Sequence, residues 1–177
     1  KNGIAKDVAN FVFTKIEPFA QYGFNKSHAA AYALIAYQTA YLKTYHKEDF
    51  IAATMSTELT NTSKLREFVE ELKRLNVEII KPSVNKSFAE FKAIDGKLFY
   101  GLGAIKNVGF EAISNIVKER DKNGKFKSFV DFVNRVDIKD VNKLQMEGLV
   151  KAGVFDEFVK DRNKILNSIP KIIQKIK

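Results

Sequence analysis

A short polar segment, residues 25–28, combines side chains that could hold a phosphate. Asn25 and Ser27 are residue types whose side-chain oxygens cap a helix start, and a lysine and a histidine stand beside them. A helix start presents free backbone N–H groups and the positive end of the helix dipole, which both attract anions. The sequence therefore predicts a phosphate-facing corner, with a polar cap on a core helix as the alternative. The candidate residues are Asn25, Lys26, Ser27, His28 and the nearby Tyr32.

A glycine-rich segment, residues 101–109, contains a second possible phosphate site. Asn107 and Gly109 are residue types that accept positive φ, so we expect a tight hairpin that leads into a helix. Successive backbone N–H groups of such a hairpin form an anion-binding nest. The alternative is an ordinary turn that packs two helices, and this is what we expect of the later turn at Gly153. The candidate phosphate-binding residues are Lys106, Asn107, Val108 and Gly109.

The sequence shows no catalytic set. Two-metal phosphoryl transfer needs a cluster of carboxylates, and the nearest acidic pair, Glu48 and Asp49, is explained by helix capping. Two histidines are too few for a histidine-built metal site, and the absence of cysteine excludes disulfides and thiolate sites. We therefore expect no catalytic residue, no metal site and no cofactor in this chain.

The charge balance favours an anionic partner. The net charge of +9 rises along the chain, with 6 basic against 5 acidic residues in 1–60, 11 against 8 in 61–120 and 13 against 8 in 121–177. Nucleic acid is the first expectation and a membrane surface the second, although solvated lysine-rich faces give the same count. Neither a membrane span nor a secretion signal is visible. The absence of cysteine fits a reducing cytoplasm.

Hydrophobic periodicity predicts the helices around the first polar segment. Apolar residues recur at helical spacing over 6–21, where Pro18 can kink or end the last turn. Residues 29–45 are apolar on nearly every face, and such a helix is normally buried. Three of its tyrosines, spaced four apart, could stack bases, but we expect them to pack in the core. They are Tyr37, Tyr41 and Tyr45.

The rest of the chain predicts a mainly α fold with a small β element. A helix should start at residue 47 or 49, and the next should run from a cap at Thr62-Ser63 to Asn76. The run 77–80 predicts a strand, and Asp95-Gly96 predicts a type I′ hairpin. Helices follow in the last third, with the final one starting near Asp161. The two glycine-bearing turns should pair their helices as a compact four-helix unit.

Several of these stretches resemble known families. Residues 105–109 resemble the helix-hairpin-helix motif, with Asn107 where the first glycine is usual. Residues 22–34, which read YGFNKSHAAAYAL, and 37–43, YQTAYLK, are similar to the fingers region of the C-family replicative polymerases, the bacterial DNA polymerase III α subunits. The segments 82–85, 100–109 and 153–156 match the same family in the same order.

The resemblance implies a fragment of a larger enzyme. Residues 1–80 would be a helical fingers portion, 81–100 a β-hairpin connection and 101–177 a helix-hairpin-helix DNA-binding region. The catalytic aspartates and Mg²⁺ would belong to a palm that precedes this segment, so the fragment itself should be inactive. The implied partners are the primer-template duplex, a deoxynucleoside triphosphate and, for the whole protein, the sliding clamp and other replisome subunits. The implied location is the bacterial cytoplasm.

The residues alone leave two alternatives open. The chain could be a free-standing helix-hairpin-helix scaffold that binds DNA, or a basic module that docks an acidic protein. Duplex binding that weakens with salt and does not depend on the base sequence would favour the two DNA-binding hypotheses over the protein-docking module.

Overall fold

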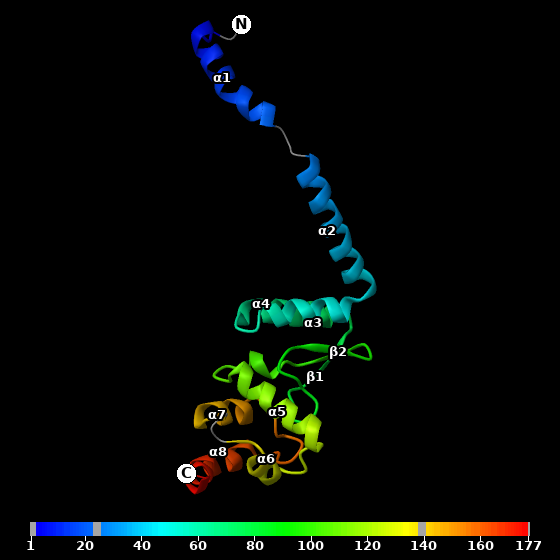
Figure 1. Cartoon of the computed structure of the whole chain (residues 1–177), viewed down its shortest axis with the longest axis vertical. Helices are drawn as coiled ribbons and strands as arrows, with labels where there is room; N and C mark the ends of the chain where they lie inside the picture. Colours follow the sequence, from blue (N-terminus) through cyan, green and yellow to red (C-terminus); the bar gives the residue numbers. More distant parts are fainter. Residues whose placement is uncertain (1–2, 23–25, 138–140, 177) are drawn as a thin grey trace. The chain divides into compact units, whose positions relative to one another are not determined.

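The computed structural model describes residues 3–22, 26–137 and 141–176 (Figure 1). Its backbone contacts divide the chain into one unit of residues 1–45 and a second of residues 46–177. The described part is mainly helical with one three-stranded sheet, which confirms the predicted fold class. The proposed division at residues 80 and 100 stays a prediction.

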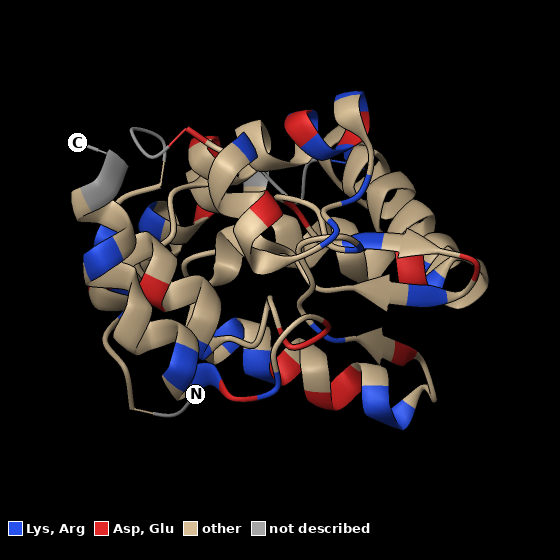
Figure 2. Ribbon diagram, turned by 90° about the horizontal axis from the view of Figure 1, so that it is seen from below, with Lys and Arg blue, Asp and Glu red and all other residues tan. Residues whose placement is uncertain are grey.

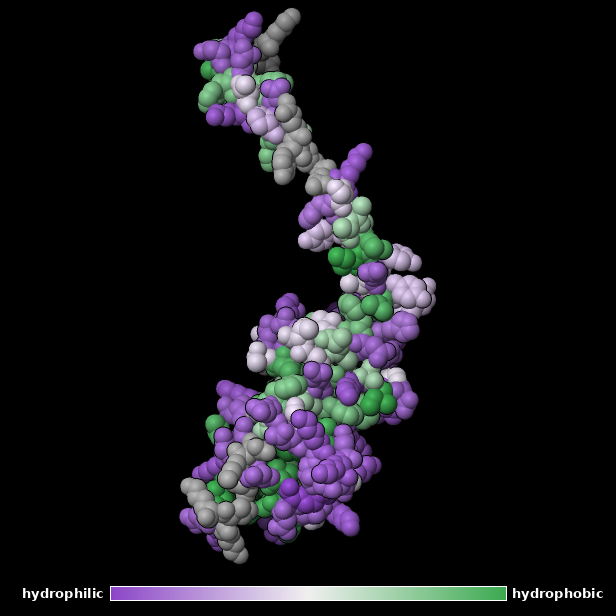
Figure 3. Space-filling model, viewed as in Figure 1, coloured by the Kyte–Doolittle hydropathy of each residue, from purple (hydrophilic) through white to green (hydrophobic). Residues whose placement is uncertain are grey.

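The first unit consists of α1, Lys6–Tyr22, and α2, Lys26–Tyr45. The first helix continues through Pro18 to Tyr22, so the proline does not end it as it could have done. Apolar side chains on both helices are exposed, and Figure 3 shows hydrophobic atoms on the surface of α2.

The expectation that α2 is a buried helix is wrong for this chain. None of the described residues of α2 is buried. The tyrosines expected in the core are exposed by 67%, 47% and 68% at Tyr37, Tyr41 and Tyr45. Their rings contact one another instead, with centroids 6.4 and 4.7 Å apart along the helix. An apolar helix is buried only where another surface faces it, and the described residues of this unit provide none.

The second unit begins with α3, Lys47–Thr57, and α4, Thr62–Arg74. The cap of α4 is Asn61, whose side chain accepts from the backbone N–H of Lys64, rather than the predicted Thr62-Ser63 pair. The helix ends near Asn76 as predicted, and this residue follows the C-cap Leu75 with a φ of 55°. The amides of Asn76 and Val77 donate to the carbonyls of Lys73 and Leu72, the bond pattern of a Schellman cap.

The sheet contains β1, Glu78–Ile80, β2, Lys92–Ile94, and β3, Lys97–Phe99, in the order β1-β3-β2. The strands β2 and β3 are antiparallel, with Ile94 opposite Lys97, and β1 runs parallel to β3. Asp95 and Gly96, which connect β2 to β3, have φ values of 51° and 72°. Two successive positive φ values are what a type I′ turn requires, so the predicted hairpin is confirmed.

The chain then forms a short 3₁₀ turn, η1, Leu102–Ala104, and four helices. These are α5, Phe110–Asn123, α6, Phe129–Arg135, α7, Lys143–Lys151, and α8, Arg162–Ile176. The helix α5 begins directly after the predicted hairpin, and α8 begins next to its predicted start near Asp161. Ser128 caps α6, Asn142 caps α7, and the carboxylate of Asp161 accepts from the first amides of α8.

Two hydrophobic cores hold the second unit together. The sheet core packs α3 and α4 on the strands, and the helix core gathers η1 and α5 to α8. Phe129, Phe132 and Phe155 form the aromatic centre of the helix core, with ring centroids of Phe132 and Phe155 4.8 Å apart. The fully buried members include Met55, Leu72 and Leu98 in the sheet core and Ile113, Leu149 and Ile169 in the helix core.

The segment that passes between the two cores is fastened by buried polar contacts. Arg120, only 6% exposed, donates from Nη1 to the carbonyls of Val84 at 3.2 Å and Ser87 at 2.6 Å. Asn85 donates to the carbonyl of Phe126 and accepts from its amide. A buried guanidinium is tolerated because its N–H groups find acceptors in this way.

Candidate nucleic-acid interface

The predicted hairpin at residues 106–109 forms and reaches solvent. Lys106 and Asn107 are exposed, and Val108 and Gly109 are half-buried. Asn107 has a φ of 66°, so this asparagine takes the left-handed conformation that the sequence pattern anticipated. The amide of Val108 donates to the carbonyl of Ile105 at 3.1 Å and closes the turn. That amide is therefore used within the protein.

The expectation that Gly109 takes a positive φ is wrong. Its φ is −77° and its ψ is 136°, which any residue can adopt. A Cβ at this position would lie 3.0 Å from Nε2 of Gln145, so the glycine makes room for a side chain of α7. Gln145 is itself held in a capping box with Asn142.

The start of α5 leaves backbone donors free of a side-chain cap. The N-cap residue Gly109 has no side chain that could accept a hydrogen bond from the first-turn amides. The amide of Ile113 makes the first bond of the helix, to the carbonyl of Gly109 at 3.2 Å. The preceding amides of the first turn have no intrahelical acceptor, and they lie at the positive end of the helix dipole. This end of α5 can accept an anion.

Helix α7 braces the inner side of the hairpin. A Cβ on Gly148 would lie 3.0 Å from the carbonyl oxygen of Lys106 and 3.1 Å from Cγ2 of Val108. The glycine therefore lets the backbone of α7 approach the turn closely. We did not single out Gly148 or Gln145 from the sequence. A glycine inside a helix that otherwise lacks breakers was the available signal, because glycine is unfavourable there without a packing reason.

The turn at Gly153 is filled by side chains. Gly153 has a φ of 81°, and the amides of Gly153 and Val154 donate to the carbonyls of Val150 and Leu149, as in a Schellman cap. A Cβ there would overlap the guanidinium of Arg162 and lie 2.7 Å from Oδ2 of Asp156. Arg162 bonds Asp156, which lowers the pKa of that carboxyl. These contacts support the expected structural role of this glycine.

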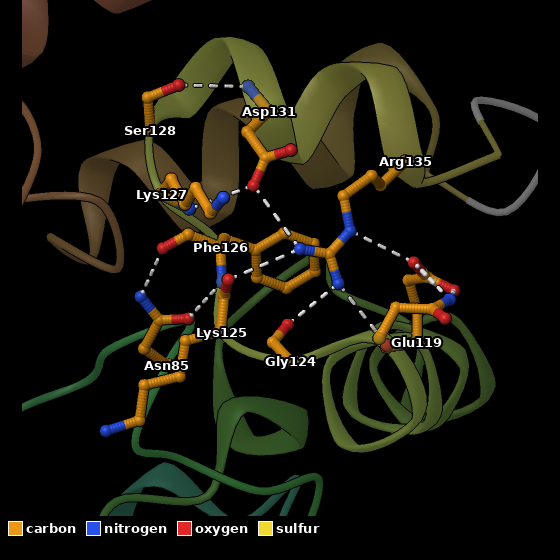
Figure 4. Close-up of polar contacts among 10 residues, drawn as sticks. Asn85, Glu119, Gly124, Lys125, Phe126, Lys127, Ser128, Asp131 and Arg135 are labelled. Atoms are coloured by element: carbon orange, nitrogen blue, oxygen red, sulfur yellow. Dashed lines mark hydrogen bonds and ion pairs between the residues drawn. The ribbon is translucent and has the colours of Figure 1, made fainter.

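A second arginine joins α6 to α5. Figure 4 shows Arg135 donating to Glu119, Asp131 and the carbonyl of Gly124. The pKa of Glu119 is lowered, first by the side chain of Asn123 and then by Arg135. The pKa of Asp131 is lowered, first by the backbone N–H of Lys127 and then by Arg135. These basic and acidic groups neutralise each other, so this cluster supports the fold and adds little net positive charge.

Ion pairing decides which lysines and arginines can serve an anionic ligand. Basic and acidic residues are interspersed along the ribbon in Figure 2. Arg135, Lys151 and Arg162 all have acidic partners, so these three cations are engaged within the protein. Within the described residues, Lys106 forms no salt bridge.

The polar segment at the start of α2 is only partly described. Asn25 lies outside the described residues. Lys26, Ser27 and His28 occupy the first turn of α2 and are exposed. Tyr32 is 60% exposed, and its ring centroid lies 4.4 Å from that of His28. This set belongs to the first unit and the hairpin set to the second, so the structure presents them as two separate candidates.

The described residues offer neither a cluster that could bind a metal nor a membrane-spanning helix. Across residues 3–22, 26–137 and 141–176, no three His, Asp or Glu side chains gather in a way that could hold a metal ion. The described helices include none whose length and apolar content would suffice to cross a bilayer.

Comparison with known proteins confirms the resemblance drawn from the motifs. A family model described as helix-hairpin-helix motif matches residues 76–165. The DNA polymerase III subunit alpha of Borreliella burgdorferi is 44% identical over 174 residues, 98% of this chain and 15% of that protein. Those of Caulobacter vibrioides and Thermus aquaticus are 43% and 41% identical, each over 98% of this chain and over 15% and 14% of their own lengths. The chain thus spans about 15% of the length of these curated relatives.

Proposed function

Because this chain belongs to the helix-hairpin-helix family, we propose that residues 101–177 bind duplex DNA through its phosphates without reading the base sequence. One observation carries the proposal: an exposed hairpin containing Lys106 and Asn107 leads directly into a helix start that no described side chain caps. Backbone N–H groups and a lysine can hold a phosphate oxygen wherever it occurs, since every base pair presents the same phosphates.

Each hairpin residue would have its own part. Lys106 supplies the charge, and Asn107 provides the left-handed turn that leads toward α5. Val108 anchors the turn against α7, because its own amide already donates to Ile105. Gly109 brings the helix start close to the phosphate. The free amides at the start of α5 would supply the hydrogen bonds.

We further infer that the chain is a segment of a bacterial replicative DNA polymerase. The relatives named DNA polymerase III subunit alpha support this, with 41–44% identity over nearly the whole chain. In that setting Asn25, Lys26, Ser27, His28 and Tyr32 would lie near the incoming nucleotide and the template. The palm with Mg²⁺, the sliding clamp and the other replisome subunits would be contacted or supplied by the rest of the protein, in the bacterial cytoplasm.

Salt titration of duplex binding tests the proposed DNA contact. Fluorescence anisotropy of the full chain with labelled blunt duplexes of different sequence should give similar affinities. The slope of log affinity against log salt should be about −0.9 for each phosphate contacted. Lys106→Ala should weaken binding to all duplexes alike and reduce the magnitude of that slope by about 0.9. Binding that ignores Lys106, or that prefers one sequence strongly, would contradict the proposal.

A primer-extension assay tests the assignment of the chemistry to another part of the polymerase. The purified chain with Mg²⁺, primer-template and deoxynucleotides should extend no primer, because its described residues hold no carboxylate cluster. Extension by pure protein would overturn that assignment. Absence of DNA binding together with capture of an acidic protein would favour the docking-module alternative.

A further inference from the structure

A groove lies beside the hairpin, between α5 and the segment that leads into β2. Its lining combines two aromatic rings, two lysines and one acidic residue. We call it the Phe110 groove. Its main members are Phe88, Glu90, Lys92, Phe110, Ser114 and Lys118.

The aromatic ring of Phe110 is partly exposed at the N-terminal end of α5. Phe110 is the first residue of α5, directly follows Gly109, and is 45% exposed. A Cβ on Gly103 would lie 3.1 Å from Cδ2 of Phe110 and 2.8 Å from the carbonyl oxygen of Ala89. The ring therefore packs directly against the backbone of Gly103. Its position is set by packing, while part of its surface stays open.

The opposite wall is fixed to the same framework. The amides of Leu102 and Gly103 donate to the carbonyls of Phe88 and Ala89 at 2.8 and 2.9 Å. Nη1 of Arg120 donates a hydrogen bond to the carbonyl of Ser87 at 2.6 Å. The groove is thus built on the same backbone that leads into the hairpin, and it needs no rearrangement to exist.

The groove also carries positive charge along its length. Phe110, Ser114 and Lys118 follow at intervals of four residues, so they lie along one face of α5. Lys92 from β2 faces them, and its Nζ lies 4.3 Å from the centroid of the Phe88 ring. Neither lysine forms a salt bridge within the described residues. Glu90 is the acidic member, so the main members named above carry a net positive charge.

We propose that the Phe110 groove binds an unpaired DNA strand that continues from the duplex held at the hairpin. A base stacks on the open part of the Phe110 ring, and Lys92 and Lys118 meet the adjoining phosphates. Aromatic stacking beside cations suits single-stranded nucleic acid, since every base has a π-face and every nucleotide a charge. The inference rests on the proposed function, because Phe110 directly follows the hairpin that would contact the duplex.

Three DNA probes test this assignment with the full chain. They are a blunt duplex, the same duplex with a short unpaired thymidine extension, and an unpaired oligonucleotide. The chain should bind the extended duplex more tightly than the blunt one. Phe110→Ala should remove that advantage, by roughly fivefold or more, beyond any change in its affinity for the blunt duplex measured alongside. Phe110→Trp should preserve it.

The controls separate this proposal from the hairpin contact. Val130→Ala, which truncates a 65% exposed apolar residue outside the groove, should change neither affinity. If the blunt duplex does not bind, the proposed function fails, whereas a Phe110-dependent affinity for the unpaired oligonucleotide still supports the groove. If Phe110→Ala does not fold by circular dichroism, Lys118→Glu provides the same test, with loss of the extension advantage expected.

Two results would overturn the proposal. One is an extension advantage that survives both Phe110→Ala and Lys118→Glu. The other is an equal loss of affinity for blunt and extended duplexes in Phe110→Ala, which would make the ring part of the duplex contact.

Discussion

The two glycine-bearing turns of the second unit, residues 106–109 and 152–155, share a sequence signal but differ in what fills the space beside them. At the first, Lys106 and Asn107 face solvent, and the helix that follows begins with uncapped amides. At the second, Arg162 and Asp156 occupy that space and bond each other. The first turn can therefore receive a ligand from outside, while the second has an internal partner. A glycine in a turn indicates geometry, and the neighbouring side chains decide its use.

The largest expected difference concerns the aromatic residue that follows each turn. Phe155→Ala removes a ring that is 1% exposed and packs on Phe129 and Phe132. We expect a loss of about 3–5 kcal/mol in the free energy of unfolding. Phe110→Ala, at 45% exposure, should lose far less. Urea unfolding followed by circular dichroism measures the free energy of unfolding of both variants. Equal losses would contradict the proposed difference between the two turns.

Alanine substitution at Gly153 and at Gly109 should lower the free energy of unfolding by different amounts. Gly153→Ala should destabilise the chain by about 1–2 kcal/mol, because φ is 81° there and the new Cβ displaces Arg162. Gly96→Ala is the matched control, since φ is 72° but the space is open, so it carries only the backbone penalty. Gly109→Ala should have the smallest effect on unfolding, because its φ is ordinary. A destabilisation at Gly109 equal to that at Gly153 would contradict this ranking.

Charge reversal beside each turn compares their roles in DNA binding. Lys106→Glu should weaken binding to a blunt duplex by about tenfold, since it replaces an attractive contact with phosphate by a repulsive one. Lys151→Glu, beside the second turn, should change affinity by less than about threefold at moderate salt, where distant charges are screened. Anisotropy measurements at one fixed salt concentration decide between them. A stronger effect at Lys151 would reverse the assignment of the two turns.

The smallest expected difference is in the response to acid. The bond from Arg162 lowers the pKa of Asp156 below the ordinary value of 3.8. A lowered carboxyl pKa contributes stability above 3.8 that disappears as the pH falls through the folded-state value. Because the pair is nearly half exposed, its contribution is about 0.2–1 kcal/mol. Arg162→Met should therefore destabilise the chain at neutral pH and hardly at all in strong acid. Lys106→Ala should show no such pH dependence.

Local signals in the sequence predicted the parts of the fold that depend on local geometry. The Asp95-Gly96 turn, the end of α4 at Asn76 and the left-handed Asn107 follow from backbone preferences of single residues, and each is present. The exposure of Lys106 and Asn107 also agrees with the pattern. Their contact with phosphate stays a prediction.

Features that depend on distant contacts were missed or misread. Gly148 and Gln145 matter because α7 packs on the hairpin, which no local pattern states. Arg120 is buried because carbonyls 33 and 36 residues away accept its hydrogen bonds. The expected burial of α2 assumed a facing surface, and hydrophobicity alone does not supply one. The cap at Asn61 was missed by one residue because Thr62 and Ser63 are equally good capping types.

The hydrogen bonds from Arg120 to residues 84–87 affect how the second unit unfolds. This stretch leads from the sheet core into the helix core, and its carbonyls are tied to the last turns of α5. Heating that loosens the helix core releases these carbonyls from the guanidinium, and the stretch that joins β1 to β2 is then no longer held. We therefore expect the sheet and the four helices to melt in a single transition, and their amide protons to exchange with solvent at a common slow rate.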